Sequence, residues 1–322
     1  QRLLKWAPGP GGRHIELGIS EMNLFLLLGQ LGLSHDQHGE VLLPVGTLYD
    51  PFVLRGLDAF VYSLYNGARF VVAGTPSGVT LAPEGGAHQS TITGSVGLAL
   101  PGVTYCEPAY DREVDWLLCD GLDRLTRTGG DSTYLRLSTR SIDQEVFWRR
   151  VREVGEDQLR RDVISGGYRL VDAPPDGRPG VTIVASGAVV PEALAAAAEL
   201  DEEGVAATVI NVTSADRLYR GWQGRFAEAV KGGALTVGPA EDRCQLHRLV
   251  APEERDRPVV SVHDAASHTL AWMGAALGAR QTPLGVDRFG ESGTIAELHE
   301  LCGISAGHVV NAALIAVSRP GV

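Results

Sequence analysis

Short apolar runs alternate with helix-length amphipathic segments along this chain, and this order restricts the fold to a few architectures. Apolar runs of four or five residues between turn signals predict strands, whereas the longer amphipathic segments between them predict helices. Such an order is typical of α/β proteins in which helices cover parallel or mostly parallel sheets. Because a chain of 322 residues is longer than a typical domain with one hydrophobic core, we expect two sheet domains of about 150 residues each.

The apolar pattern places these elements in two groups. In the first group, strands are expected at residues 41–45, 69–73, 103–106 and 134–137. Helices between them are expected at residues 21–31, 51–65 and 110–126. In the second group, strands are expected at residues 181–185, 207–211, 234–238 and 259–262. Helices there are expected at residues 191–200, 224–230 and 306–317.

A charged stretch and a polar stretch separate the two groups. Residues 144–162 are charged and helix-like, and we interpret 145–161 as a solvated helix face. Residues 172–180 are rich in proline and glycine. We therefore predict a first domain at 1–143, a helical and polar linker at 144–180, and a second domain at 181–322.

Charge and composition exclude several partners. The net charge is −11 and the isoelectric point is about 5.3, with no basic patch to neutralise phosphates, so nucleic acid is not expected as a partner. We expect no membrane association, since no apolar run reaches transmembrane length. Four cysteines without metal-ligand spacing suggest reduced thiols and a cytoplasmic protein. The chain begins at Gln1 without methionine, so we expect residues upstream of it.

Three short segments carry residues suited to chemistry, although each has a simpler explanation. In Gly-Ile-Ser-Glu at 18–21, Ser20 and Glu21 are typical of a helix start. In Gly-Thr-Leu-Tyr-Asp-Pro-Phe at 46–52, Tyr49 and Phe52 have a spacing common in core packing. His88 ends a glycine-rich loop, where a histidine is often merely solvated.

Together, the order and spacing of these segments resemble the transketolase superfamily of thiamine diphosphate enzymes. The resemblance is closest to the homodimeric bacterial type of pyruvate dehydrogenase, its decarboxylating component. The third segment, residues 74–88, reads Gly-Thr-Pro-Ser-Gly-Val-Thr-Leu-Ala-Pro-Glu-Gly-Gly-Ala-His and is similar to a family loop. The likeness continues through residues 108–114, 211–214 and 287–292. It therefore implies a transketolase-type pyrimidine-binding domain followed by a transketolase-type C-terminal domain.

The resemblance also implies roles for five residues. Glu21 would meet the N1′ atom of the cofactor's aminopyrimidine and favour the imino tautomer, while Tyr49 and Phe52 would pack on that ring. His88 would face the substrate. Glu84 would orient His88 or take part in proton transfer, but an ordinary loop carboxylate is an equal alternative. Pro51 and the pair Gly86-Ala87 depart from the family pattern, which puts substrate identity in doubt more than cofactor identity.

The other half of such a site is absent from the sequence. Relatives bind the diphosphate and Mg²⁺ or Ca²⁺ through Gly-Asp-Gly and a later asparagine, whereas this chain contains no Gly-Asp-Gly. We expect no metal ligands in this chain. A partner subunit, in a heterotetramer, or an upstream segment, in a dimer of longer chains, would supply that domain.

The resemblance favours decarboxylation of a pyruvate-like 2-oxo acid, with the acyl unit passed to lipoamide or another acceptor. Ketol transfer between sugar phosphates, as in transketolases, is the alternative reaction. It usually needs several basic and histidine side chains to hold the phosphate. A scaffold subunit without catalysis is a third alternative, although Glu21, the aromatic pair and His88 occur in the order of active relatives.

Overall fold

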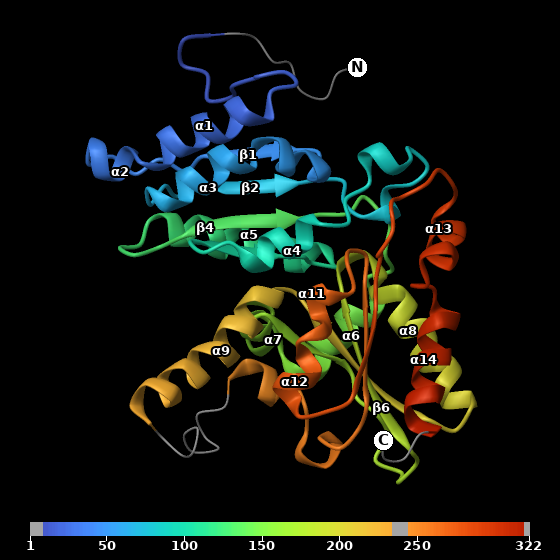
Figure 1. The fold of residues 1–322 in the computed structure, drawn as a ribbon. Helices are drawn as coiled ribbons and strands as arrows, with labels where there is room; N and C mark the ends of the chain where they lie inside the picture. Colours follow the sequence, from blue (N-terminus) through green and yellow to red (C-terminus); the bar gives the residue numbers. More distant parts are fainter. Residues whose placement is uncertain (1–8, 234–243, 319–322) are drawn as a thin grey trace.

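Two sheets flanked by helices make up the chain in the computed structural model, which describes residues 9–233 and 244–318 (Figure 1). The first sheet has the order β1-β2-β4-β3 and the second β5-β7-β6-β8-β9. All pairings are parallel except that between β5 and β7. The expected α/β class with mostly parallel sheets is confirmed.

The first unit interleaves its strands with helices. Its strands are β1 (Val45–Leu48), β2 (Val71–Gly74), β3 (Val103–Cys106) and β4 (Ser132–Arg136). Its helices are α1 (Glu21–Gly32), α2 (Ser34–Gln37), α3 (Leu57–Tyr65), α4 (Thr93–Ala99) and α5 (Asp111–Leu125). Three short 3₁₀ helices lie in its loops: η1 (Asp50–Gly56), η2 (Val79–Leu81) and η3 (Gly86–His88).

Side-chain alternation explains why helices cover both faces of this sheet. On β2, Val72 packs with Phe25 of α1 and Phe60 of α3. The neighbouring Val71 belongs to a second core with Leu117 of α5. Because successive strand residues point to opposite faces, a fully apolar strand such as β2 must be covered on both sides.

The second unit contains the larger sheet. Its strands are β5 (Gly167–Val171), β6 (Gly180–Ser186), β7 (Ala206–Val212), β8 (Val259–His263) and β9 (Gln281–Leu284). The helices around it are α8 (Val190–Glu202), α9 (Ala215–Gly232), α10 (Gln245–Arg248), α11 (His268–Ala271), α12 (Met273–Leu277), α13 (Ile295–Cys302) and α14 (Ala306–Ser318). The short 3₁₀ helices are η4 (Gly187–Val189) and η6 (Pro252–Glu254).

The segment 144–180 contains more structure than a linker requires. It forms α6 (Glu145–Val154), α7 (Glu156–Ile164) and β5, which joins the second sheet antiparallel to β7. Phe147 of α6 is buried in the core that both sheets share. The domain boundaries at 143 and 181 remain a prediction.

Some expected elements differ from those observed. The strand expected at 41–45 is wrong, because β1 pairs with β2 only from Val45 onward, while Val41, Leu42 and Leu43 remain about half exposed. The helix expected at 51–65 begins as the 3₁₀ helix η1, and the one at 224–230 is part of the longer α9. Elements β5, β9, α4 and α13 were not expected. The strand expected at 234–238 lies outside the described residues.

One apolar stretch is long enough to span a membrane, whereas the sequence analysis expected none of that length. An 18-residue window within Ile295–Ser318 has a mean hydropathy of 1.7, so by length and composition this stretch could cross a membrane. In the structure Gly303 adopts a left-handed conformation that ends α13 before α14 begins. Val309, Val310 and Ala313 of α14 are buried in the main core, as in a helix that packs on a sheet.

Candidate thiamine diphosphate half-site

The three segments singled out in the sequence converge at one edge of the first sheet. Tyr49 and Phe52 follow β1, and His88 lies in the loop that follows β2. Since β1 and β2 are adjacent and parallel, the loops after them leave the sheet on the same side. Glu21 is the first residue of α1, and its side chain is only 13% exposed.

The aromatic side chains and His88 form a compact cluster. The ring centroids of Tyr49 and Phe52 are 5.9 Å apart. The His88 ring lies 5.8 Å from Tyr49 and 5.6 Å from Phe52, edge-on to both. These distances are typical of interacting aromatic pairs, so the histidine is held beside the aromatic pair and not in open solvent.

Arg55 joins this cluster and was missed from the sequence. Its guanidinium carbon lies 3.8 Å from the centroid of the Phe52 ring, and its Nη1 atom lies 3.8 Å from Oε1 of Glu21. Arg55 follows Phe52 by three residues in η1, which places both side chains on one side of that turn. It thereby connects the candidate acid with the candidate stacking ring.

Among the residues that the structure describes, the side chains of Glu84 and Ser20 make no contacts that support a role in the site. Glu84 is exposed in the loop that carries His88, and among residues 9–233 and 244–318 it makes no hydrogen bond or ion pair. Its suggested role in orienting His88 therefore has no contact to support it. Ser20 precedes α1, but its side chain makes no capping bond. The simple helix-start explanation thus accounts for Ser20 less well than expected.

The loop that carries His88 is held by the second unit. The carboxylate of Asp264 accepts hydrogen bonds from the amides of Val79 and Thr80, at 2.8 and 3.0 Å, and from the Thr80 hydroxyl. Gly78 has a φ of +72°, and a side chain there would collide with Asp264. Burial raises the pKa of Asp264 above its ordinary value. Sequence reasoning missed Asp264, which follows the predicted strand 259–262.

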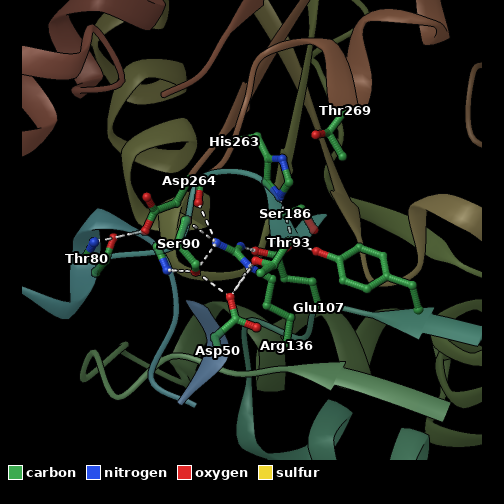
Figure 2. A network of polar contacts seen from close by, with 12 residues as sticks. Asp50, Thr80, Ser90, Thr93, Glu107, Arg136, Ser186, His263, Asp264 and Thr269 are labelled. Atoms are coloured by element: carbon green, nitrogen blue, oxygen red, sulfur yellow. Dashed lines mark hydrogen bonds and ion pairs between the residues drawn. The ribbon is translucent and has the colours of Figure 1, made fainter. Parts of the chain in front are cut away.

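A buried polar network adjoins the cluster along the chain, since it contains Asp50, which follows Tyr49 (Figure 2). Its centre is Arg136 at the end of β4, whose side chain is fully buried. Arg136 pairs with Asp50 and Glu107, and Glu107 also bonds His263 of β8 at 2.6 Å. A single arginine within the apolar strand 134–137 was the signal for this network, since a buried arginine requires charged partners.

Glu107 supplies a negative charge to this network. Burial opposes its ionisation, but Arg136 and His263 outweigh burial and hold the pKa of Glu107 at about 2. Arg136 therefore faces two buried carboxylates, Asp50 and Glu107. The network joins the first unit to the second through the contacts of Glu107 with His263 and of Arg136 with the backbone oxygen of Asp264.

These residues fit one end of the cofactor. A carboxylate on a helix start beside aromatic rings suits a planar aminopyrimidine, which needs stacking surfaces and one hydrogen-bonding acid. The described part of the chain contains no group of three or more histidine, cysteine, aspartate or glutamate side chains arranged to hold a metal ion. The residues at this cluster thus fit the ring of the cofactor.

Comparisons with known proteins give the class. A family model described as the transketolase-like TK C-terminal domain matches residues 166–305. The pyruvate dehydrogenase E1 component of Mycolicibacterium smegmatis is 26% identical over 340 residues, covering 99% of this chain and 34% of that protein. Transketolases and 1-deoxy-D-xylulose-5-phosphate synthases are also among the relatives.

Two further matches are chains of similar length to this one. The 6-deoxy-6-sulfo-D-fructose transketolase subunit SqwH of Clostridium sp. (strain MSTE9) is 27% identical over 310 residues, covering 94% of this chain and 80% of that protein. The solved structure of a split-gene transketolase, an inactive β4 tetramer, matches with a TM-score of 0.65 at 21% identity. It covers 94% of this chain and 83% of that chain.

The fold and these matches together define a transketolase-like protein. More particularly, residues 166–305 match the transketolase-like C-terminal domain, and the chain is similar over 94% of its length to a transketolase subunit. It spans little more than a third of the full-length curated relatives it matches, 34% and 38% of two of them.

Proposed function

We propose that this chain provides the pyrimidine-facing half of a thiamine diphosphate site. The observation that carries the proposal is the convergence of Glu21, the Tyr49 and Phe52 pair, and His88 at one sheet edge. Relatives of this chain are named transketolase and pyruvate dehydrogenase E1, and the residues fit the ring of that cofactor. When bound, thiamine diphosphate supplies a nucleophilic carbon that adds to a substrate carbonyl.

Each residue of the cluster has a distinct task in this proposal. Glu21 holds a proton at N1′ of the aminopyrimidine, which favours the tautomer able to accept a proton elsewhere on the ring. Tyr49 and Phe52 fix the plane of that ring and exclude water from it. His88 donates a hydrogen bond to the substrate carboxylate or to the oxygen that gains charge during the reaction. Glu84 remains a candidate for substrate contact from the exposed side of the loop.

We further propose that the substrate is a pyruvate-like 2-oxo acid, which is decarboxylated before its acyl unit passes to lipoamide or another acceptor. The cluster presents a single histidine, His88, beside the aromatic pair, which suits a small substrate with a single carboxylate. The match to a pyruvate dehydrogenase E1 component over 99% of this chain supports the same choice.

Ketol transfer between sugar phosphates is the second candidate reaction. It is favoured by the two matches of similar length, since SqwH is named as a transketolase subunit and the solved neighbour as a split-gene transketolase. In that case the additional phosphate-binding groups would have to come from the partner.

The activity also needs the diphosphate half of the site. We propose that a Gly-Asp-Gly domain holds Mg²⁺ or Ca²⁺, either on a separate subunit in a heterotetramer or upstream in a dimer of longer chains, in the cytoplasm. Exposed apolar side chains such as Ile19, Val45 and Tyr65, which are 91%, 52% and 84% exposed, lie on or beside α1, β1 and α3. Exposed apolar side chains near an edge strand suit a protein partner.

Reconstitution with the Gly-Asp-Gly partner, or with the upstream half, tests the proposed reaction. Carbon dioxide release from pyruvate and ketol transfer from fructose 6-phosphate should be measured on the same preparation, with thiamine diphosphate and Mg²⁺ present. We expect decarboxylation to dominate. Ketol transfer without decarboxylation of pyruvate would favour the second candidate. Failure of the complete assembly in both reactions would support a scaffold role.

His88→Ala separates the role of His88 from that of the ring-binding residues. We expect the variant to lose turnover while its affinity for thiamine diphosphate changes little, because His88 is proposed to face the substrate. Glu84→Gln serves as the matched variant in the same loop. A large loss of cofactor affinity with normal turnover at saturation would place His88 on the wrong side of the ring.

A further inference from the structure

The buried guanidinium of Arg136 contacts two of the three site segments, the one with Tyr49 and Phe52 and the one with His88. Nε of Arg136 donates to Oδ2 of Asp50 at 3.1 Å and to Oγ1 of Thr93 at 3.2 Å. Its Nη2 donates to the backbone oxygens of Ser90, at 3.0 Å, and of Asp264, at 2.8 Å. Its Nη1 donates to Glu107. Every nitrogen of the side chain is thus committed (Figure 2).

The partners of Arg136 are close neighbours of the site residues along the chain. Asp50 lies between Tyr49 and Phe52, and it is fully buried while Tyr49 beside it is 40% exposed. Ser90 lies two residues after His88. The Ser90 hydroxyl also donates to Asp50 and accepts from the amide of Gly78, so it ties the two ends of the His88 loop together. A displacement at Arg136 would therefore reach both segments.

The second unit completes this arrangement. Asp264 offers its backbone oxygen to Arg136 and its carboxylate to the amides of Val79 and Thr80 in the His88 loop. The loop is consequently fixed from two sides, by Arg136 and by Asp264. The contacts of Asp264 with the loop and with Arg136 depend on the second unit lying against the first.

Only an arginine can serve all of these partners at once. Its planar fork presents five donors in fixed directions, whereas a lysine ammonium is a single point with three donors. A lysine at 136 would keep the buried charge near Asp50 and Glu107. It would lose the simultaneous bonds to Asp50 and to the oxygens of Ser90 and Asp264.

We propose that Arg136 is a positioning residue, which sets the distance between the Tyr49 and Phe52 rings and His88 through Asp50 and Ser90. The proposal deepens the proposed function, because these rings and His88 are the groups assigned there to cofactor and substrate. Arg136 itself touches neither. Its effect on the reaction is therefore indirect and should appear in the geometry of the cluster even without cofactor.

Nuclear magnetic resonance on the chain labelled at histidine tests the geometry directly. The His88 ring lies edge-on to two aromatic rings, so its resonance, assigned with His88→Gln, reports their relative positions. We expect Arg136→Lys to displace the His88 resonance while that of the distant His308 on α14 stays unchanged. Ser90→Ala, a smaller change that keeps the buried ion pairs, should displace it in the same direction.

Turnover of the reconstituted assembly provides the second readout. Per folded molecule, we expect Arg136→Lys to lower kcat about tenfold to a hundredfold, on the scale of a small misplacement of reacting groups, with a smaller change in KM. The proposal is overturned if Arg136→Lys keeps both the His88 resonance and kcat. If Arg136→Lys fails to fold, an unchanged His88 resonance in Ser90→Ala overturns it. Failure of the wild-type assembly to bind thiamine diphosphate would refute the proposed function and leave the resonance test unaffected.

Discussion

Phe52 has a ring face that Arg55 covers and that the proposed function assigns to the cofactor. Arg55 lies over the ring at 3.8 Å and reaches toward Glu21. A guanidinium and an aminopyrimidine are both flat, both stack on aromatic rings and both donate hydrogen bonds to a carboxylate. In the free chain Arg55 therefore occupies the place that the ring of the cofactor is expected to take.

Replacing Glu21 with glutamine tests the proposed acid. Gln is nearly isosteric but cannot exchange the proton at N1′, so we expect activity of the reconstituted assembly to fall about 10²- to 10⁴-fold. The thermal midpoint should stay close to that of the wild type. Glu40→Gln, at an exposed position away from the cluster, is the control. Near-normal turnover in Glu21→Gln would reject Glu21 as the acid.

Replacing Arg55 with alanine tests its competition with the cofactor. Arg55 is 56% exposed, and its ion pair with Glu21 is long, so the contact is weak and easily displaced. We expect Arg55→Ala to tighten binding of thiamine diphosphate to the complete assembly by about threefold to tenfold, measured by calorimetry. Arg127→Ala, which removes an exposed ion pair elsewhere, should have no effect. Weaker binding in Arg55→Ala would show that Arg55 helps to hold the cofactor.

At the scale of elements, carboxylates connect the two units. Glu107, at the end of β3, bonds Arg136 and His263. Glu192 of α8 bonds Arg140, just after β4, at 2.6 Å, and His299 of α13 at 3.1 Å. Burial opposes the charge of both carboxylates, but their cationic and histidine partners outweigh it, and each has a pKa of about 2.

This arrangement predicts a loss of stability in acid. A carboxylate whose pKa is lower in the folded state stabilises it above the ordinary value of 4.5, and this contribution disappears as the pH falls from 4.5 toward 2. For Glu107 the shift corresponds to at most about 3 kcal/mol. Urea unfolding across this window should show a steep fall for the wild type. The fall should be shallower in Glu107→Gln and unchanged in the exposed control Glu153→Gln. An identical slope in Glu107→Gln would contradict the assignment.

At the scale of the whole molecule, the proposed function assigns contacts with the ring of the cofactor to this chain and contacts with its diphosphate to a partner domain. We therefore expect the isolated chain to bind neither Mg²⁺ nor thiamine diphosphate tightly, because charged contacts to the diphosphate contribute much of the affinity. Calorimetry on the chain alone and mixed with its Gly-Asp-Gly partner measures the difference. Tight, Mg²⁺-dependent binding by the isolated chain would contradict the half-site proposal.

The sequence by itself determined the architecture and the principal site residues. Alternating apolar runs predict parallel strands, and β3 was found at the predicted residues 103–106. Motif order placed Glu21, Tyr49, Phe52 and His88 in a single site, which the structure brings together although the roles of these residues remain predictions. The strand prediction succeeds because side-chain periodicity is a local pattern. The site residues were predicted from the resemblance to a family, and Tyr49 and His88 lie near each other because the loops after adjacent parallel strands leave the sheet on the same side.

Only the tertiary structure decided how that site is supported. Arg136, Glu107 and Asp264 are far apart in the sequence, and each depends on a partner that chain folding brings near. The start of β1 at Val45 and the placement of β5 beside β7 likewise depend on which neighbouring strand is available for pairing. Long-range pairing leaves no periodic signal in a sequence, and for that reason the ion pair of Arg55 with Glu21 also became visible only in the folded chain.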